Sequence, residues 1–168
     1  MRKHSPSLET TWLFGTLLAL AVLLVFWPAL RGEFVYDDEL LFGPSNVATR
    51  SLGAAIAHTF DPLWSFDRPT PTSDIGGSLE RAFWRPLAVV AFALGRALPF
   101  DGATGPHLVS LFAHLAAVFA AWRLATRLIG HELAGFLAAL LFALHPLMAE
   151  PVAWAAAVND PLAGTLVL

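Results

Sequence analysis

The sequence has no cysteine, one lysine and one tyrosine among its 168 residues, and only 14% of the residues are charged. Without cysteine there is no disulfide framework, no thiolate metal ligand and no thiol nucleophile, so carboxylates, histidine and arginine carry the available chemistry. The formal net charge of −3 excludes the basic surface that binds a nucleic-acid backbone. The sequence has too few charged side chains to cover the surface of a soluble globular protein. We therefore expect the chain to reside in a membrane.

The sequence contains several long stretches without a charged residue. Hydrophobic residues make up 57% of the chain, and its mean hydropathy is +0.63. The uncharged run 10–30 has 21 residues and predicts a helix about 31 Å long, which matches the hydrocarbon core of a bilayer. A cleaved signal peptide is the alternative, but the end of this run has no A-x-A cleavage site. Similar runs predict a second span at 106–122, a third at 133–149 and the start of a fourth at 152–168.

The segment 31–105 is predicted to be a large extracytoplasmic loop between the first two spans. Its apolar stretch 86–100 is short for a span and carries Arg96, so we expect an interfacial helix there. This placement leaves both short basic segments, residues 2–3 and 123–127, in the cytoplasm, as the positive-inside rule requires. If 86–100 crossed the membrane instead, residues 123–127 would lie outside. The sequence thus predicts an all-α, polytopic membrane helix bundle in the cytoplasmic membrane, with a cytoplasmic N-terminus and the lipid bilayer around it.

Two further features are expected inside this loop. Residues 67–78 are rich in turn-forming and polar residues, which predicts a surface loop. Leu52, Ile56 and Phe60 recur at every fourth position, which predicts a short amphipathic helix over 51–60 on the membrane surface.

Three consecutive carboxylates follow the first predicted span, at Asp37, Asp38 and Glu39. Adjacent carboxylates repel, so one of them can have a raised pKa and act as a general base. Ionised together, they could instead hold a divalent cation such as Mg²⁺ or Mn²⁺. The alternative is a solvated acidic turn that caps the following helix. The apolar neighbours Tyr36 and Leu40 place the cluster close to the membrane interface, where desolvation perturbs a pKa most.

Histidines recur along the second and third predicted spans. His107 and His114 are seven residues apart and share a helix face, but about 10 Å of rise separates them, too far for both to bind one metal ion directly. Hydrogen-bonded helix packing is the other interpretation. His145 precedes Pro146 inside an apolar run, and this proline is predicted to kink or end the helix.

The remaining ionisable candidates stand at helix ends. Arg85 precedes Pro86 at the start of the predicted interfacial helix, where it could bind a phosphate or extend to lipid headgroups. Glu150 closes the third predicted span, and Asp160 stands at the mouth of the fourth. Ionisable groups at such positions in a membrane protein are functional candidates.

Taken in order, these landmarks resemble the N-terminal part of GT-C glycosyltransferases, and among them the bacterial relatives of the protein O-mannosyltransferases, including those with tetratricopeptide repeats. The matching motifs are Asp37-Asp38 after the first span, Arg85-Pro86-Leu87, His107-Leu108-Val109 with His114, His145-Pro146 with Glu150, Val152-Ala153-Trp154, and Asp160. Two positions depart from the pattern. Ser110 stands where these relatives usually have asparagine, and Val158 stands where arginine is common.

The resemblance implies an enzyme that transfers a sugar from a polyprenyl-phosphate donor to an acceptor hydroxyl on the extracytoplasmic face. It implies Asp37 as the catalytic base and Asp38 as its partner, for positioning or for a metal ion. The secondary substrate-binding candidates are Glu39, Arg85, His107, His145, Glu150 and Asp160.

Members of that family are several hundred residues longer and bind the donor through later segments. We therefore expect this chain to be a truncated piece that is inactive alone. The alternatives are a non-catalytic polytopic membrane protein and an inactive gene fragment.

Overall fold

The computed structural model describes residues 8–36, 38–42, 46, 49–58 and 85–168. The regular elements in these ranges are helices: α1 (Leu8–Phe26), η1 (Trp27–Arg31), α2 (Asp38–Leu41), α3 (Leu52–His58), α5 (Pro86–Ala97), α6 (Thr104–Ile129), α7 (Glu132–Ala143), η2 (Pro146–Met148), α8 (Ala149–Ala153), η3 (Ala155–Val158) and α9 (Asn159–Val167). The predicted all-α fold class is confirmed. The predicted surface loop 67–78 lies outside the described residues.

Among the described residues, two helices are long and apolar enough to cross a membrane. One is α1 continued by η1, with 24 residues, and the other is α6, with 26 residues. The predicted second span, 106–122, is shorter than α6, which continues to Ile129 because arginine is a good helix former. Gly130 ends α6 in the left-handed conformation, with a φ of 73°, and its N–H donates to the carbonyl of Thr126.

The third apolar run is a broken helix. Helix α7 ends at Ala143. Pro146 is the first residue of η2, a position where the backbone N–H that proline lacks would have no partner within the helix. The Nδ1 atom of His145 accepts a hydrogen bond 3.2 Å long from the N–H of Leu147 and so caps the new helix. The two parts are bent by 56°, and together they count as a third candidate span. The predicted kink at His145-Pro146 is confirmed.

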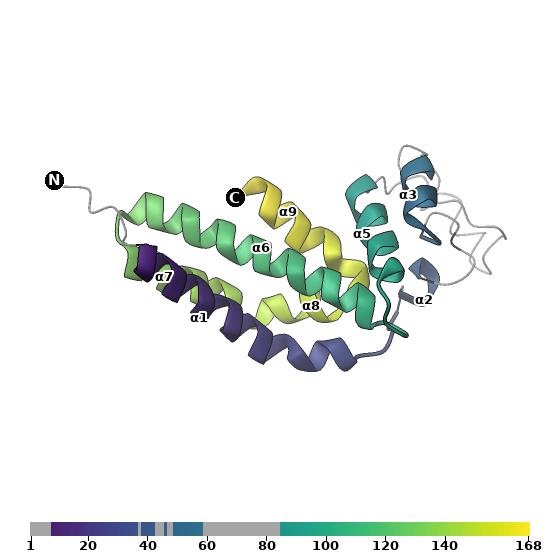
Figure 1. Cartoon of the computed structure of the whole chain (residues 1–168), viewed down its shortest axis with the longest axis horizontal. Coiled ribbons are helices and arrows are strands. Elements are labelled where there is room, and N and C mark those ends of the chain that lie inside the picture. The colour runs from purple at the N-terminus through teal and green to yellow at the C-terminus, as the bar shows by residue number, and fades with distance from the viewer. Residues whose placement is uncertain (1–7, 37, 43–45, 47–48, 59–84) are drawn as a thin grey trace.

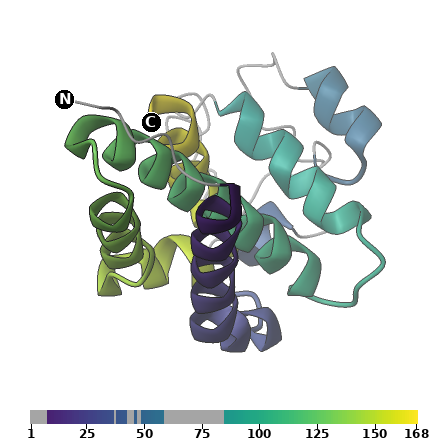
Figure 2. The ribbon, with the colours of Figure 1, turned by 60° about the vertical axis from the view of Figure 1, so that its left-hand side comes forward.

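The short helices of the predicted loop lie at one end of the bundle. In Figure 1, α1, α6 and α7 run along the long axis, and α2, α3 and α5 lie at the end where α6 begins. Helix α5 runs across the direction of α6, and Figure 2 shows α3 and α5 on one side of α6 and α7 on the other. The start of α1 and the α6–α7 connection lie together at the opposite end. The membrane side of each end, and with it the predicted topology of the loop and of the basic segment 123–127, stays a prediction.

The crossing of α5 over α6 requires a glycine at the point of contact. A β-carbon on Gly95 would lie 2.8 Å from the Cα atom of Pro106, which is backbone and cannot move aside. Close approach of this kind is what small residues allow between helices in membranes.

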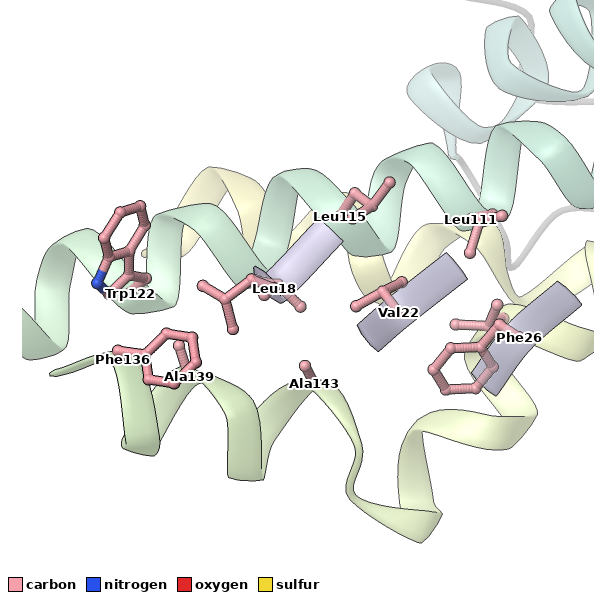
Figure 3. Close-up of a cluster of buried hydrophobic side chains, with 11 residues drawn as sticks. Leu18, Val22, Phe26, Leu111, Leu115, Trp122, Phe136, Ala139 and Ala143 are labelled. Atoms are coloured by element: carbon pink, nitrogen blue, oxygen red, sulfur yellow. The ribbon is translucent and has the colours of Figure 1, made fainter. Parts of the chain in front are cut away.

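The core lies between α1, α6 and α7. Figure 3 shows Leu18, Val22 and Phe26 of α1 pointing toward side chains of α6 and α7. Their partners there are Leu111, Leu115, Trp122, Phe136, Ala139 and Ala143. The remaining faces of α1 carry exposed apolar side chains such as Trp12 and Leu24. Such a surface is suited to lipid.

Candidate functional site

Asp38 is a fully buried carboxylate at the start of α2, with an exposed fraction of 0%. Its Oδ1 atom accepts a hydrogen bond 2.7 Å long from the N–H of Ala156, and its Oδ2 atom accepts one 3.1 Å long from the N–H of Val35. Burial raises the pKa of Asp38 above its usual 3.8, while these backbone N–H groups and His107 act in the opposite direction. The carboxylate thus joins the start of α2 to η3.

The chain reaches Asp38 through a tight turn. Tyr36 has a φ of 51°, a left-handed conformation that side chains rarely adopt, and the N–H of Asp38 donates to the carbonyl of Val35 over 3.0 Å. The exposed ring of Tyr36 meets Trp154 edge to face, with 6.2 Å between the ring centroids. Two contacts, a hydrogen bond to Ala156 in η3 and a ring contact to Trp154 just before it, therefore hold this turn against that part of the chain. Asp37, the predicted base, follows Tyr36 in the sequence and lies outside the described residues.

His107 lies buried on α6 behind the same turn, with an exposed fraction of 1%. Neither of its ring nitrogens makes a hydrogen bond of normal geometry within the described structure. Its electrostatic partners are the carboxylate of Asp38 and the backbone of Glu33. A β-carbon on Gly32 would stand only 3.3 Å from Nε2 of His107, so the glycine leaves room for the ring. The structure therefore groups two predicted site residues, Asp38 and His107.

The other polar residues of this face of α6 differ in their bonding. His114 is also buried, and its Nε2 atom lies 3.1 Å from the carbonyl oxygen of Ala143, the last residue of α7. The packing interpretation of His114 is thus supported. Ser110 lies between the two histidines, is fully buried, and its hydroxyl has no hydrogen-bond partner within the described structure.

A second polar group joins α5 to α9. Nη1 of Arg85 donates to Oδ1 of Asn159 over 3.2 Å, and Nδ2 of Asn159 donates to Oδ1 of Asp160 over 2.6 Å. Arg85 and Asp160, two predicted candidates far apart in the sequence, are therefore linked through one amide. Sequence reasoning missed Asn159, although a polar residue beside Asp160 in an apolar stretch was a signal for it.

The other candidates lie apart from these two groups. His145 uses Nδ1 to cap η2, and Glu150 is exposed in the first turn of α8, where a carboxylate stabilises a helix start. Within the described part of the chain, neither side chain bonds to Asp38 or to Arg85. Glu39 is exposed on α2.

The described donors do not fit a metal ion. Among the described residues, no three His, Asp or Glu side chains lie close enough together to hold one. Both oxygens of Asp38 accept backbone N–H groups. The Asp37–Asp38 cation site stays a prediction, and the chemistry proposed below uses no metal.

A surface cavity of about 380 Å³ opens beside the turn between Val35 and Asp38, which we call the acidic turn. Its walls are residues 31–34, Glu39 and residues 101–104. The hydroxyl of Thr104 donates to the carbonyl of Leu30 over 3.2 Å, which fixes one wall against the other.

Comparison with known proteins gives two curated relatives from Drosophila melanogaster. Protein O-mannosyl-transferase Tmtc1 is 29% identical over 155 residues, which cover 88% of this chain and 17% of that protein. Protein O-mannosyl-transferase Tmtc2 is 32% identical over 156 residues, which cover 91% of this chain and 15% of that protein. The chain thus spans about one sixth of the length of these relatives. No family model matches it, and no solved structure matches it significantly.

These relatives support part of the resemblance inferred from the motifs. The chain has distant similarity to part of two protein O-mannosyltransferases, and its described residues include helices long and apolar enough to cross a membrane. Both matches are to animal proteins, so they lend nothing to the bacterial side of that resemblance.

Proposed function

We propose that this chain forms the part of a membrane glycosyltransferase that holds the catalytic base, and that the enzyme transfers a sugar from a polyprenyl-phosphate donor to an acceptor hydroxyl. The observation that carries the proposal is the buried hydrogen bonding of Asp38, which fixes the end of the acidic turn to the bundle. Asp38 is buried and bonded to Ala156 at the end of the bundle where α2, α3 and α5 lie, and Asp37 directly precedes it in the sequence. We place this end on the extracytoplasmic face, following the positive-inside rule.

In the proposed reaction, the carboxylate of Asp37 takes the proton of the acceptor hydroxyl. The acceptor oxygen then forms a bond to C1 of the sugar, and the bond from C1 to the phosphate oxygen breaks. The electron pair of that bond leaves with the lipid phosphate. A positioned general base of this kind accelerates a reaction by about 10² to 10⁴-fold.

Asp38 has the role of a positioning residue in this proposal. Both of its oxygens accept backbone N–H groups, and its side chain is out of contact with solvent. It therefore sets the place of its neighbour and does not itself touch the substrate.

The pair of Arg85 and Asn159 is the proposed site for the donor phosphate. A guanidinium binds phosphate through charge-assisted hydrogen bonds, and the amide of Asn159 orients it. The position of the pair fits this role, because it links the start of α5 to the start of α9 at an exposed site. Extension of Arg85 to lipid headgroups is the competing role.

The proposal is tested by sugar transfer from a polyprenyl-phosphate mannose donor in membranes that contain the product of the complete reading frame. Asp37→Asn should lower the rate by at least about 100-fold, because the amide cannot accept the proton. The matched control is Glu132→Gln at the start of α7, at the opposite end of the bundle, which should leave the rate unchanged. A rate in Asp37→Asn equal to that of the control removes Asp37 from the mechanism.

The second candidate is a non-catalytic polytopic membrane protein. The observation that favours it is the same burial of Asp38, because a bonded carboxylate can serve only to hold the loop against the bundle. In that case both variants insert normally and transfer is absent with every donor.

A further inference from the structure

We infer that the aromatic ring of Tyr36 stacks on the sugar ring of the donor, and that Trp154 holds the tyrosine side chain in place for this contact. This inference rests on the proposed function and adds to it a side chain that contacts the transferred sugar.

Tyr36 occupies a backbone position that does not suit a tyrosine. Its φ of 51° is in the left-handed region, and among the described residues no other side chain except the glycines has a positive φ. Asparagine adopts this conformation more readily, whereas a bulky side chain is strained in it. Such strain costs about 1 to 3 kcal/mol and is concentrated at binding and catalytic sites. The backbone of the turn therefore does not explain the tyrosine, and its side chain is the place to look for a role.

The side chain of Tyr36 also adds little to the core. It is 88% exposed, and its ring meets Trp154 at an angle of 72° between the ring planes. An edge-to-face contact of this kind is worth about 0.5 to 1.5 kcal/mol, which at most offsets the strain of the backbone. The contact fixes the direction of the tyrosine ring and leaves most of its surface open. An aromatic surface is thus oriented and available to a ligand.

A sugar ring is the ligand that this surface fits. The face of an aromatic ring is negative, and its body is apolar. One side of a pyranose ring presents C–H groups, which are apolar and slightly positive, while its hydroxyl groups point outward to water or to polar partners. Anchoring of Tyr36 at the membrane–water interface, where tyrosine is common, is the competing role.

The position of Tyr36 agrees with the proposed reaction. It directly precedes Asp37 in the sequence, so a sugar on its ring is next to the segment that carries the proposed base. Trp154 directly precedes η3, and Asn159, the partner of Arg85 in the proposed phosphate site, directly follows it. At about 2 Å of rise per residue, η3 separates these two positions by about 10 Å. A donor that carries its sugar next to its phosphate can therefore contact both ends of η3.

The test is binding of two lipids to the purified product of the complete reading frame in nanodiscs. One lipid is polyprenyl-phosphate mannose, and the other is the same polyprenyl phosphate without the sugar. Tyr36→Asn removes the ring but keeps a residue that tolerates the left-handed turn. This variant should bind the mannose lipid about three- to ten-fold more weakly and the sugar-free lipid as before. The matched control, Tyr36→Phe, keeps the ring and should bind both lipids as the unchanged protein does.

Three results overturn the inference. The first is equal binding of the mannose lipid by Tyr36→Asn and the unchanged protein. The second is an equal weakening for both lipids, because Tyr36 then acts on the fold or on the placement in the membrane. The third is a loss in Tyr36→Phe as large as in Tyr36→Asn, because the hydroxyl and not the ring then makes the contact.

Sugar transfer by Asp37→Asn separates this inference from the proposed function. If Asp37→Asn stops transfer while Tyr36→Asn binds the mannose lipid normally, the proposed function stands and this inference fails. If Asp37→Asn transfers normally while Tyr36→Asn selectively loses the mannose lipid, the proposed base is wrong and the sugar contact stands. An unchanged protein that binds neither lipid overturns both.

Discussion

The carboxylate of Asp38 and the backbone N–H of Ala156 are joined by a buried hydrogen bond 2.7 Å long, across a separation of 118 residues. This bond ties the first turn after α1 to the segment that follows the broken third helix. The position of the acidic turn therefore depends on the folding of α8 and η3, and these elements become part of the candidate site without contributing a reacting group.

Removal of the Asp38 carboxylate should destabilise the fold. Asp38→Ala leaves the N–H of Ala156 buried without a partner, which costs about 1 to 3 kcal/mol. Asp38→Asn keeps one acceptor oxygen and should cost less. Reversible chemical denaturation in detergent micelles measures both variants against the unchanged chain. Equal stability of the alanine variant and the unchanged chain would show that this bond does not hold the turn.

The difference in stability between the unchanged chain and Asp38→Asn should fall as the pH rises. Burial raises the pKa of Asp38 in the folded state above its usual 3.8, so the folded state holds this proton more tightly than the unfolded state. The resulting contribution to stability is fully present below pH 3.8 and is lost as the pH rises through the raised pKa. Denaturation at a series of pH values should show the difference between the two proteins falling over this window and then levelling. A difference that grows with pH contradicts the direction of the shift.

Substitution of Gly95 should separate α5 from α6. A β-carbon in Gly95→Ala would stand 2.8 Å from a backbone atom of Pro106, so one of the two helices must move. We expect a loss of stability of about 1 to 3 kcal/mol, as for overpacked cores. The control is Gly53→Ala on α3, where the nearest heavy atom is 3.9 Å away. Similar denaturation midpoints for the two variants would mean that the crossing can relax.

The membrane orientation can be measured cleanly because the chain contains no cysteine. Single cysteines at Asp101 and at His131 place one label at each end of the bundle, at exposed positions. A maleimide that cannot cross the membrane should label Asp101→Cys in intact cells and should label His131→Cys only after the membrane is opened. The reverse pattern would invert the predicted topology.

Donor binding should depend on both members of the Arg85–Asn159 pair. Asn159→Ala removes the acceptor that orients the guanidinium and should raise the donor KM several-fold, with a smaller effect on kcat. Arg85→Lys keeps the charge but loses the planar set of donors and should raise KM further. Michaelis–Menten kinetics in the complete enzyme test this. An unchanged donor KM in both variants would assign Arg85 to the lipid headgroups.

Local features of the sequence determined the helices of this protein. Runs without charge predicted the long helices, and the missing N–H of Pro146 predicted the break after α7, because both effects act over a few neighbouring residues. Boundaries were predicted less well. The end of α6 depends on Gly130, where the left-handed backbone stops the helix beyond the last apolar residues.

Only the tertiary structure decided which candidates meet. The motifs singled out Asp38, His107 and Arg85, but not the burial of Asp38 against Ala156, nor the bond from Arg85 to Asn159. Those pairings join residues 118 and 74 positions apart. Which distant residues come together depends on how α5, η3 and α9 pack around the start of α6, and no local pattern of hydrophobicity or charge encodes that packing.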